Sequence, residues 1–395
     1  MSARTGHWWP AAATVFACGW GGNQFTPLLV MYRANGWSTV TVDALLGAYV
    51  FGLVPGLLTA GTLSERWGRR RVMIGGTVLS VLASVLLTIP GVAWIAAGRF
   101  VTGLGAAAAM AVGTVWVAEL SRARGASHPV AVRRGALWLT LGFGLGAGIA
   151  GVLAQWGPWP MVLPYVVHAV CASAALVVAL RTPETRPVPT GPSDQRLRGR
   201  LAGMRHPRFL RVVLPMAPWI FGSAGVAYAV MPQLVGDRVG SWGLAYSTLL
   251  VVCTLGAGAL VQPFVRRLDR PSSARAVIVA MLVMTAGMVA GTLAAVVRSP
   301  VVALLAAVTL GVAYGIALVA GLQEIGRIAH PDNIAPLTGA YYALAYLGFL
   351  VPSILAVLSS VAGYDVLLAG LALVALAGST VVLRYSRAHL PRLEY

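Results

Sequence analysis

The chain has 395 residues, of which 58% are hydrophobic and only 10% are charged, and its formal net charge is +18. Soluble globular proteins carry roughly 25% charged residues, so a chain this apolar is expected in a membrane rather than in solution. The arginines stand in short clusters between long apolar runs and form no basic stripe interleaved with aromatic residues. Their placement therefore argues against nucleic-acid binding.

Twelve apolar runs are long enough to span a bilayer as helices. A crossing helix needs about 20 mostly apolar residues, and a strand edge left open in lipid has no hydrogen-bond partner. We therefore predict an all-α membrane protein with twelve transmembrane helices. The predicted spans are 8–32, 40–62, 72–92, 94–119, 134–155, 160–181, 209–234, 242–264, 275–296, 299–322, 335–358 and 362–384.

The distribution of arginine sets the predicted orientation. With both termini in the cytoplasm, the outer loops hold only Arg33, Arg238 and Arg298, and Arg99 lies inside a span. The reverse topology would place the arginine clusters outside, against the positive-inside bias. None of the 29 basic residues is Lys, and Ala, Gly and Val abound, which indicates a bacterial source. We expect a multi-pass protein of the bacterial cytoplasmic (inner) membrane.

The first predicted span has a polar centre. Asn23 and Gln24 fall near the bilayer midplane, where polar side chains are functional candidates. Adjacent residues of a helix point in different directions, so one of the two should line a cavity and the other should pack.

The loop between the second and third spans carries the strongest motif. Residues 61–71 read GTLSERWGRRR, with Gly61, an acid at Glu65, Gly68 and a basic cluster. This resembles the signature of the major facilitator superfamily, which has a Gly, an acid four residues later, an Arg, a Gly and basic residues. The single departure is Glu65, where the family usually has Asp. An ordinary positive-inside loop explains the arginines but not the register of the glycines and the acid.

The resemblance implies a transporter of small molecules, not an enzyme, built from two six-helix bundles that work by alternating access. In the family this loop latches the cytoplasmic side. Glu65 would face the start of the eleventh helix near Asp332, and Arg69 would contact Glu119. The longer side chain of Glu65 predicts a looser latch. The predicted gating residues are Gly61, Glu65, Arg66, Gly68, Arg69, Arg70 and Glu119.

The fourth span contains Arg99, followed by small residues as in the family signature. A charge inside a span costs several kcal/mol unless it faces a cavity or a partner, and proton-coupled members use this Arg in proton movement. The alternative is that Arg99 reaches the outer interface. Asp43 at the outer end of the second span and His168 within the sixth are further proton-coupling candidates. His168 can equally be a hydrogen-bonded packing residue.

The fifth span is rich in glycine between residues 142 and 151. Drug–proton antiporters of the superfamily carry a motif here, and Gly146 and Gly151 match it, whereas Ala147 replaces its Pro. The missing Pro removes a kink and weakens the antiporter assignment. The alternative is a tightly packed helix pair without directional meaning.

Residues 182–208 are polar, rich in Pro and basic, which predicts a cytoplasmic linker between bundles 1–181 and 209–395. A fainter basic copy of the motif stands at 265–271. The substrate-cavity candidates are Asn23, Gln24, Trp219, Tyr228, Tyr342 and Tyr346. Helix packing is the alternative for each aromatic residue.

We therefore predict proton-coupled efflux of a small drug-like or secondary-metabolite molecule. The alternative is an uptake symporter for a nutrient such as a sugar, an organic acid or an amino acid. A non-transporting membrane receptor or biosynthetic enzyme is a weaker alternative, because a static protein needs no gate. No phosphate-binding loop, metal-ligand spacing or cofactor motif is found in the sequence. We therefore expect transport to be driven by an ion gradient, with protons as the expected ion, and to need no cofactor. The protein is expected to act as a monomer in the lipid bilayer.

Overall fold

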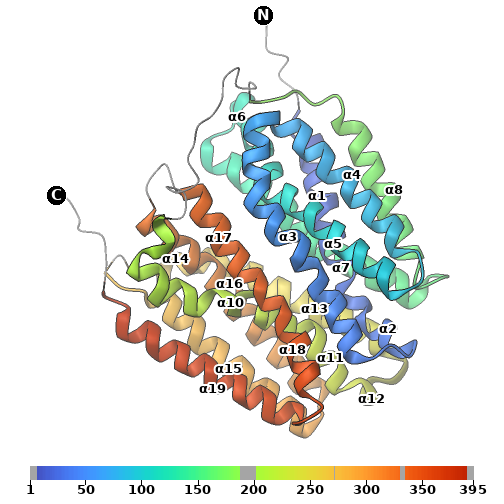
Figure 1. Ribbon diagram of the computed structural model, residues 1–395, viewed down its shortest axis with the longest axis vertical. Coiled ribbons are helices and arrows are strands. Elements are labelled where there is room, and N and C mark those ends of the chain that lie inside the picture. The colour runs from blue at the N-terminus through green and yellow to red at the C-terminus, as the bar shows by residue number, and fades with distance from the viewer. Residues whose placement is uncertain (1–6, 187–201, 271, 330–333, 389–395) are drawn as a thin grey trace, which may run out of the picture. The chain divides into compact units, whose positions relative to one another are not determined.

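The computed structural model describes residues 7–186, 202–270, 272–329 and 334–388. Its regular elements in these ranges are helices, apart from one isolated bridge between Arg270 and Ser273. The chain divides into two units (Figure 1). Unit 1 comprises Met1–Trp37 and Ala44–Asp194, and unit 2 comprises Ser38–Asp43 and Gln195–Tyr395.

Unit 1 contains the first eight α-helices, and the opening residues of α3 belong to unit 2. Within it, α1 packs against α7 and α8, and α4 packs against α5 and α8 (Figure 1). The elements are α1 (Trp9–Asn23), η1 (Thr26–Leu28), α2 (Leu29–Ala34), α3 (Thr39–Trp67), α4 (Arg69–Leu87), α5 (Val92–Ala108), η2 (Ala109–Gly113), α6 (Thr114–Ala123), α7 (His128–Trp156) and α8 (Leu163–Ala179).

In unit 2, α15 packs against both α16 and α19, and α10 packs against α16 and α17 (Figure 1). The elements are η3 (Ala202–Arg205), η4 (Phe209–Val213), α10 (Leu214–Gly225), η5 (Val226–Val230), α11 (Met231–Leu234), α12 (Gly236–Val239), η6 (Gly240–Trp242), α13 (Gly243–Val261), η7 (Gln262–Phe264), α14 (Val265–Leu268), α15 (Arg275–Val297), α16 (Pro300–Ile328), α17 (Ile334–Leu347), η8 (Gly348–Leu350), α18 (Val351–Leu358) and α19 (Tyr364–Tyr385).

Ten helical segments in the described residues are long and apolar enough to cross a membrane. The other two predicted spans are helical but shorter. The run at 8–32 is interrupted at η1, where Pro27 has no amide hydrogen to donate, so that α1 has 15 residues and α2 has six. The run at 160–181 gives α8, which has 17 residues. All twelve predicted runs therefore lie on helices, while ten satisfy the length and hydropathy that a span requires.

Glycines bring α1 and α7 close together in unit 1. A Cβ on Gly146 would lie 2.5 Å from the Trp20 Cα, and one on Gly142 would lie 2.4 Å from the Phe16 carbonyl oxygen. Only glycine, which has no Cβ, permits α1 and α7 to approach this closely, and small residues commonly allow helices to pack closely in membranes. The glycine-rich run of the predicted fifth span therefore forms a helix–helix contact.

Large apolar side chains cover much of the outside of both units. Phe51, Val170, Leu260, Leu305 and Leu373 are each more than half exposed. Such surfaces would aggregate in water, but they match the hydrocarbon of a bilayer. This pattern agrees with the ten candidate spans.

Candidate functional site

Arg99 is buried inside unit 1, with 1% of its surface exposed. It lies in the middle of α5, and its guanidinium points at backbone carbonyls of α1 and α3. Nε donates to the Leu45 oxygen at 3.3 Å, and the two terminal nitrogens donate to the oxygens of Gly22 and Leu46 at 3.5 Å each. These are long hydrogen bonds, so the cation is held loosely by several weak acceptors.

Two aromatic rings complete the surroundings of Arg99. Its Cζ lies 4.7 Å from the centroid of Phe25 and 4.8 Å from that of Tyr49. A cation over a desolvated ring gains about 2 kcal/mol, less than the cost of burying an unpaired charge. Among the described residues, no carboxylate lies within ion-pair distance of this guanidinium. The structure thus places Arg99 inside the unit, not at an outer interface.

His168 lies on α8 at the end of a buried hydrogen-bond chain. Its Nε2 is 2.9 Å from the Ala17 carbonyl oxygen, and its Nδ1 is 2.6 Å from the Ser84 Oγ. Because a carbonyl can only accept, Nε2 carries the hydrogen and Nδ1 accepts from the serine hydroxyl. The Ser84 oxygen in turn accepts from Gln24 Nε2 at 3.0 Å. The chain joins α1, α4 and α8 and requires a neutral imidazole.

Asn23 and Gln24 differ in what they leave unbonded. Asn23 donates to the Phe143 carbonyl oxygen at 3.1 Å and accepts from the Thr26 hydroxyl at 2.7 Å. Gln24 is fully buried, and its Oε1 has no hydrogen-bond partner among the described residues. The indole Nε1 of Trp20, one helical turn earlier, is also without one. Asn23 is thus a packing residue, whereas Gln24 and Trp20 keep an acceptor and a donor available.

The motif loop is organised by a residue that the sequence analysis did not single out. Glu184, after α8, accepts from the backbone amides of Arg69 at 2.8 Å and Arg70 at 3.0 Å. These are the first two residues of α4, so the carboxylate caps the positive end of that helix. Gly68 has φ of +91°, and a Cβ there would lie 2.2 Å from the Glu184 Oε2. The motif therefore needs Gly68 both for its backbone conformation and for the approach of Glu184.

The basic residues of the motif reach three different partners. The Nε of Arg69 lies 3.6 Å from the Glu119 Oε1, which is the contact that the sequence predicts, and its Nη1 donates to Ser64. Arg70 donates to the Leu180 carbonyl oxygen. The carboxylate of Glu119 also accepts from the Thr185 hydroxyl. The segment after α8 is therefore tied to the motif loop and to the end of α6.

The remaining gating candidates are less constrained. Glu65 lies 3.9 Å from Arg186, both side chains being about two-fifths exposed. Arg66 is exposed. A Cβ on Gly61 would meet no described atom within 4 Å, so no close helix contact requires this glycine in the described residues. The expected partner of Glu65 near Asp332 lies outside the described residues.

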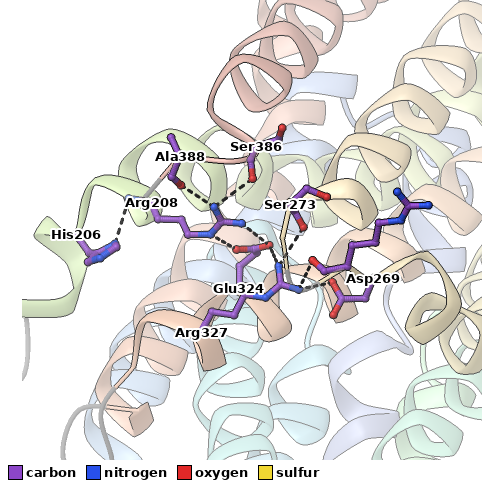
Figure 2. Close-up of polar contacts among 9 residues, drawn as sticks. His206, Arg208, Asp269, Ser273, Glu324, Arg327, Ser386 and Ala388 are labelled. Atoms are coloured by element: carbon purple, nitrogen blue, oxygen red, sulfur yellow. Dashed lines mark hydrogen bonds and ion pairs between the residues drawn. The ribbon is translucent and has the colours of Figure 1, made fainter. Parts of the chain in front are cut away.

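Unit 2 holds a network of charged residues at the end of α16, just after α14 and just before η4 (Figure 2). Arg208 is fully buried and donates to both carboxylate oxygens of Glu324, at 2.5 and 3.1 Å. Arg327 also pairs with Glu324 and lies 2.7 Å from Asp269. Asp269 falls within the faint motif copy at 265–271, but the buried pair of Arg208 and Glu324 was not predicted from the sequence.

Aromatic residues of α10, η5, α16, α17 and η8 gather inside unit 2. The rings of Phe221 and Tyr346 are stacked with centroids 3.9 Å apart. Phe349 lies 5.1 Å and Tyr314 5.6 Å from Phe221, and Tyr228 adjoins Phe349 at 6.4 Å. We call these five residues the aromatic cluster.

The other candidates stand apart from these groups. Tyr342 contacts Tyr341 at 5.6 Å between centroids, and Trp219 on α10 is partly buried. Asp43 is buried near the start of α3, and Gly151 is buried within α7. The structure therefore collects Gln24 and His168 in unit 1 and Tyr228 and Tyr346 in unit 2.

Apolar helices that bury an arginine without a carboxylate partner and a hydrogen-bonded histidine, with charged motifs at the helix ends, are typical of membrane transport proteins. Residues 11–353 match the family model of the Major Facilitator Superfamily, and the chain belongs to that superfamily. It is a multi-pass membrane protein. Its fold is similar to solved structures of the D-xylose–proton symporter, with a TM-score of 0.72 and 17% identity over 98% of both chains. It is also similar to the nucleoside transporter NupG, with a TM-score of 0.72 and 12% identity over 95% of this chain and 98% of that one.

Two curated relatives are resistance proteins. The chain is 25% identical over 234 residues to a chloramphenicol resistance protein of Pseudomonas aeruginosa, which covers 57% of this chain and 53% of the relative. It is 31% identical over 186 residues to a methylenomycin A resistance protein of Bacillus subtilis (strain 168), which covers 45% and 38%. The chain thus spans about half or less of the length of these relatives.

Proposed function

We propose that this transporter exports a small drug-like or secondary-metabolite molecule in exchange for protons. The observation that carries the direction is the similarity to two proteins named for antibiotic resistance. Removal of the compound from the cell is a direct way for a transporter to give resistance. The substrate of this chain is a compound of that general kind.

The proposal includes a membrane topology. Twelve helices cross the bacterial inner membrane, six in residues 1–181 and six in residues 209–395, with 182–208 and both termini in the cytoplasm. The distribution of arginine supports this orientation. The transporter acts as a monomer by alternating access and uses an ion gradient without a cofactor.

Proton coupling is proposed to pass through His168. If a proton binds Nδ1, both ring nitrogens become donors, and the Ser84 oxygen must accept from the ring. The serine hydrogen then needs a new acceptor, and the unpartnered Gln24 Oε1 supplies it after rotation of the amide. Protonation on α8 is thereby transmitted to Gln24 at the end of α1.

Arg99 and Asp43 are the other coupling candidates. The three carbonyl contacts of Arg99 measure 3.3 to 3.5 Å, whereas a carboxylate would give shorter, charge-assisted bonds of about 2.8 Å. Arg99 is therefore ready to bind an anionic group in another state of the transport cycle. Asp43 is proposed as a carboxylate that changes its protonation during that cycle.

Each unit offers its own groups to a substrate. In unit 1 the free acceptor of Gln24 and the free donor of Trp20 suit a hydroxyl or amide group. In unit 2 the stacked rings of the aromatic cluster suit a flat apolar body or an aromatic cation. Trp219 and Tyr342 extend these aromatic candidates. The aromatic cluster favours a compound with an aromatic ring over a sugar.

The motif loop is proposed as a gate at the cytoplasmic side. Glu184 fixes the start of α4, and the Arg69–Glu119 contact links this end to α6. Glu65 has only one exposed ion-pair partner in the described residues, so it is free to form the latch contact in one state and leave it in another.

Inverted membrane vesicles carrying a pH-sensitive dye test the proposal. Addition of one class among lipophilic cations, antibiotics, sugars and amino acids should collapse an imposed inside-acid gradient. Arg99→Ala and His168→Gln should lose the response at least tenfold, while the matched control His128→Gln, at an exposed position, should keep it. Normal proton flux in both buried-site variants would overturn their coupling roles.

Uptake is the second candidate, because the fold is similar to a D-xylose–proton symporter and because Ala147 replaces the Pro of the antiporter motif. Accumulation of a sugar or amino acid by intact cells, with no drug-driven proton movement in vesicles, would establish uptake instead of export.

A further inference from the structure

A cavity of about 440 Å³ opens at one end of unit 2, between the start of α15 and the end of α19. Four of the residues that line it are arginines: Arg270, Arg275, Arg384 and Arg387. No lining residue is acidic. The cavity therefore concentrates positive charge in a small volume, which attracts an anion.

The nearest acids do not neutralise these arginines. Asp269 is paired with Arg327, and Glu324 is paired with Arg327 and with the buried Arg208. Within the described ranges of the chain, none of the four lining guanidiniums has a carboxylate within 4 Å. Their charges are available to a ligand.

The walls of the cavity are fixed by the buried network described above (Figure 2). The amide of Ala274 donates to the Ser386 carbonyl oxygen at 3.0 Å, which joins the start of α15 to the end of α19. Arg208 donates to the same oxygen at 3.3 Å. Arg327 donates to the Arg270 carbonyl oxygen at 2.9 Å. The backbone that carries the arginines is therefore held in place before any ligand arrives, which lowers the entropic cost of binding.

An apolar surface begins directly beside the charged groups. Leu383 lines the cavity and is 59% exposed, and Ile278 lines it from α15. Further along the two packed helices, Leu282 and Leu376 are also about half exposed. A ligand with an anionic head and apolar chains would match both parts, whereas free phosphate would use only the arginines.

We propose that this cavity binds the phosphate headgroup of an anionic phospholipid, with the acyl chains lying along α15 and α19. Basic pockets between transmembrane helices on the cytoplasmic side suit such headgroups, and the positive-inside orientation puts this end of the unit in that leaflet. The site depends on the membrane location of the chain and not on the direction of transport.

The test is a lipid titration of the full chain in detergent, followed by its thermal unfolding midpoint. Phosphatidylglycerol is compared with phosphatidylcholine and with glycerol 3-phosphate, which carries the charge without the chains. The variant is Arg384→Gln with Arg387→Gln. The matched control is Arg266→Gln with Arg267→Gln, which removes the same charge from α14, whose residues do not line the cavity.

Phosphatidylglycerol should raise the midpoint saturably, and the other two probes should not. Each basic side chain near an anionic lipid surface contributes about a fivefold gain in affinity, so the cavity variant should need about 30-fold more lipid, while the control should need less than about threefold more. An equal shift of the midpoint with glycerol 3-phosphate would mean that the site binds a free anion and not a lipid. Equal losses of lipid affinity in the cavity variant and the control variant would overturn the proposal. The absence of a saturable shift of the midpoint in the parent protein would also overturn it.

Discussion

Replacing Glu324 by Gln should destabilise unit 2 far more than an ordinary loss of an ion pair. Glu324→Gln keeps the size of the side chain but removes the negative charge between Arg208 and Arg327. Arg208 is fully buried and has its shortest contacts, 2.5 and 3.1 Å, with this carboxylate. Removing one partner of a buried pair typically costs about 3–5 kcal/mol, because the other charge stays buried and unpaired.

The carbonyl oxygens of Ser386 and Ala388 remain as acceptors for Arg208, at 3.3 and 2.8 Å, so we expect the lower part of that range, about 3 kcal/mol. For a unit of about 200 residues this corresponds to a fall of roughly 6–12 °C in the unfolding midpoint. The assay is thermal unfolding of the detergent-purified protein at one scan rate, since membrane proteins often unfold irreversibly.

The control is Asp237→Asn, which breaks exposed contacts to Arg298 at 3.0 Å and Arg238 at 3.8 Å. Exposed pairs contribute about 0–1 kcal/mol, so its midpoint should fall by no more than about 4 °C. Adding Arg208→Met to Glu324→Gln removes the stranded charge and should recover part of the loss. Equal falls in the unfolding midpoints of Glu324→Gln and Asp237→Asn would contradict a large cost for the stranded buried charge. So would the absence of any recovery when Arg208→Met is added to Glu324→Gln.

Three further predictions concern unit 1. Gly146→Ala should cost about 1–3 kcal/mol, because its Cβ would lie 2.5 Å from the Trp20 Cα, whereas Gly144→Ala, whose Cβ meets nothing within 4 Å, should be neutral in the same thermal assay. Glu184→Ala should cost about 1 kcal/mol as a lost helix cap, and Gly68→Ala should then cost less in that background than in the parent; equal costs would mean that backbone strain alone requires the glycine. Ser84→Ala should cut substrate-driven proton flux at least tenfold in inverted vesicles; unchanged flux would remove the serine from the proposed relay.

The helices were predictable because apolar length is a local property of the sequence. Each of the twelve runs lies on helix, and the main surprise, the break near Pro27, follows from a residue that lacks an amide hydrogen. The motif singled out Gly68, but the sequence did not reveal the physical reason for a glycine at this position. That reason is Glu184, which stands 116 positions later and becomes its neighbour only when α8 folds back on α4.

The charged groups were harder to predict than the helices. Arg208 and Glu324 are 116 positions apart, and in the sequence each resembles an ordinary residue at the cytoplasmic edge of a span. A signal was nevertheless available, since an acid at a span end is rare in so basic a chain. For Arg99 the position was found, but its partners are carbonyl oxygens, which every residue carries and which no side-chain pattern reveals.

The network around Arg208 has a consequence for biosynthesis. Arg208 enters unit 2 at its beginning, but its partners are Glu324 and the last turns after α19, at Ser386 and Ala388. A growing chain makes these groups in order, so the arginine must stay hydrated at the membrane surface while the intervening helices insert. The contact with Glu324 can form once α16 has been made, whereas the contacts with Ser386 and Ala388 can form only after α19 has been made. The last contacts of Arg208 therefore form after the helices of unit 2 have been made, and a chain truncated before Ser386 would keep the pair with Glu324 but lose these two carbonyl acceptors.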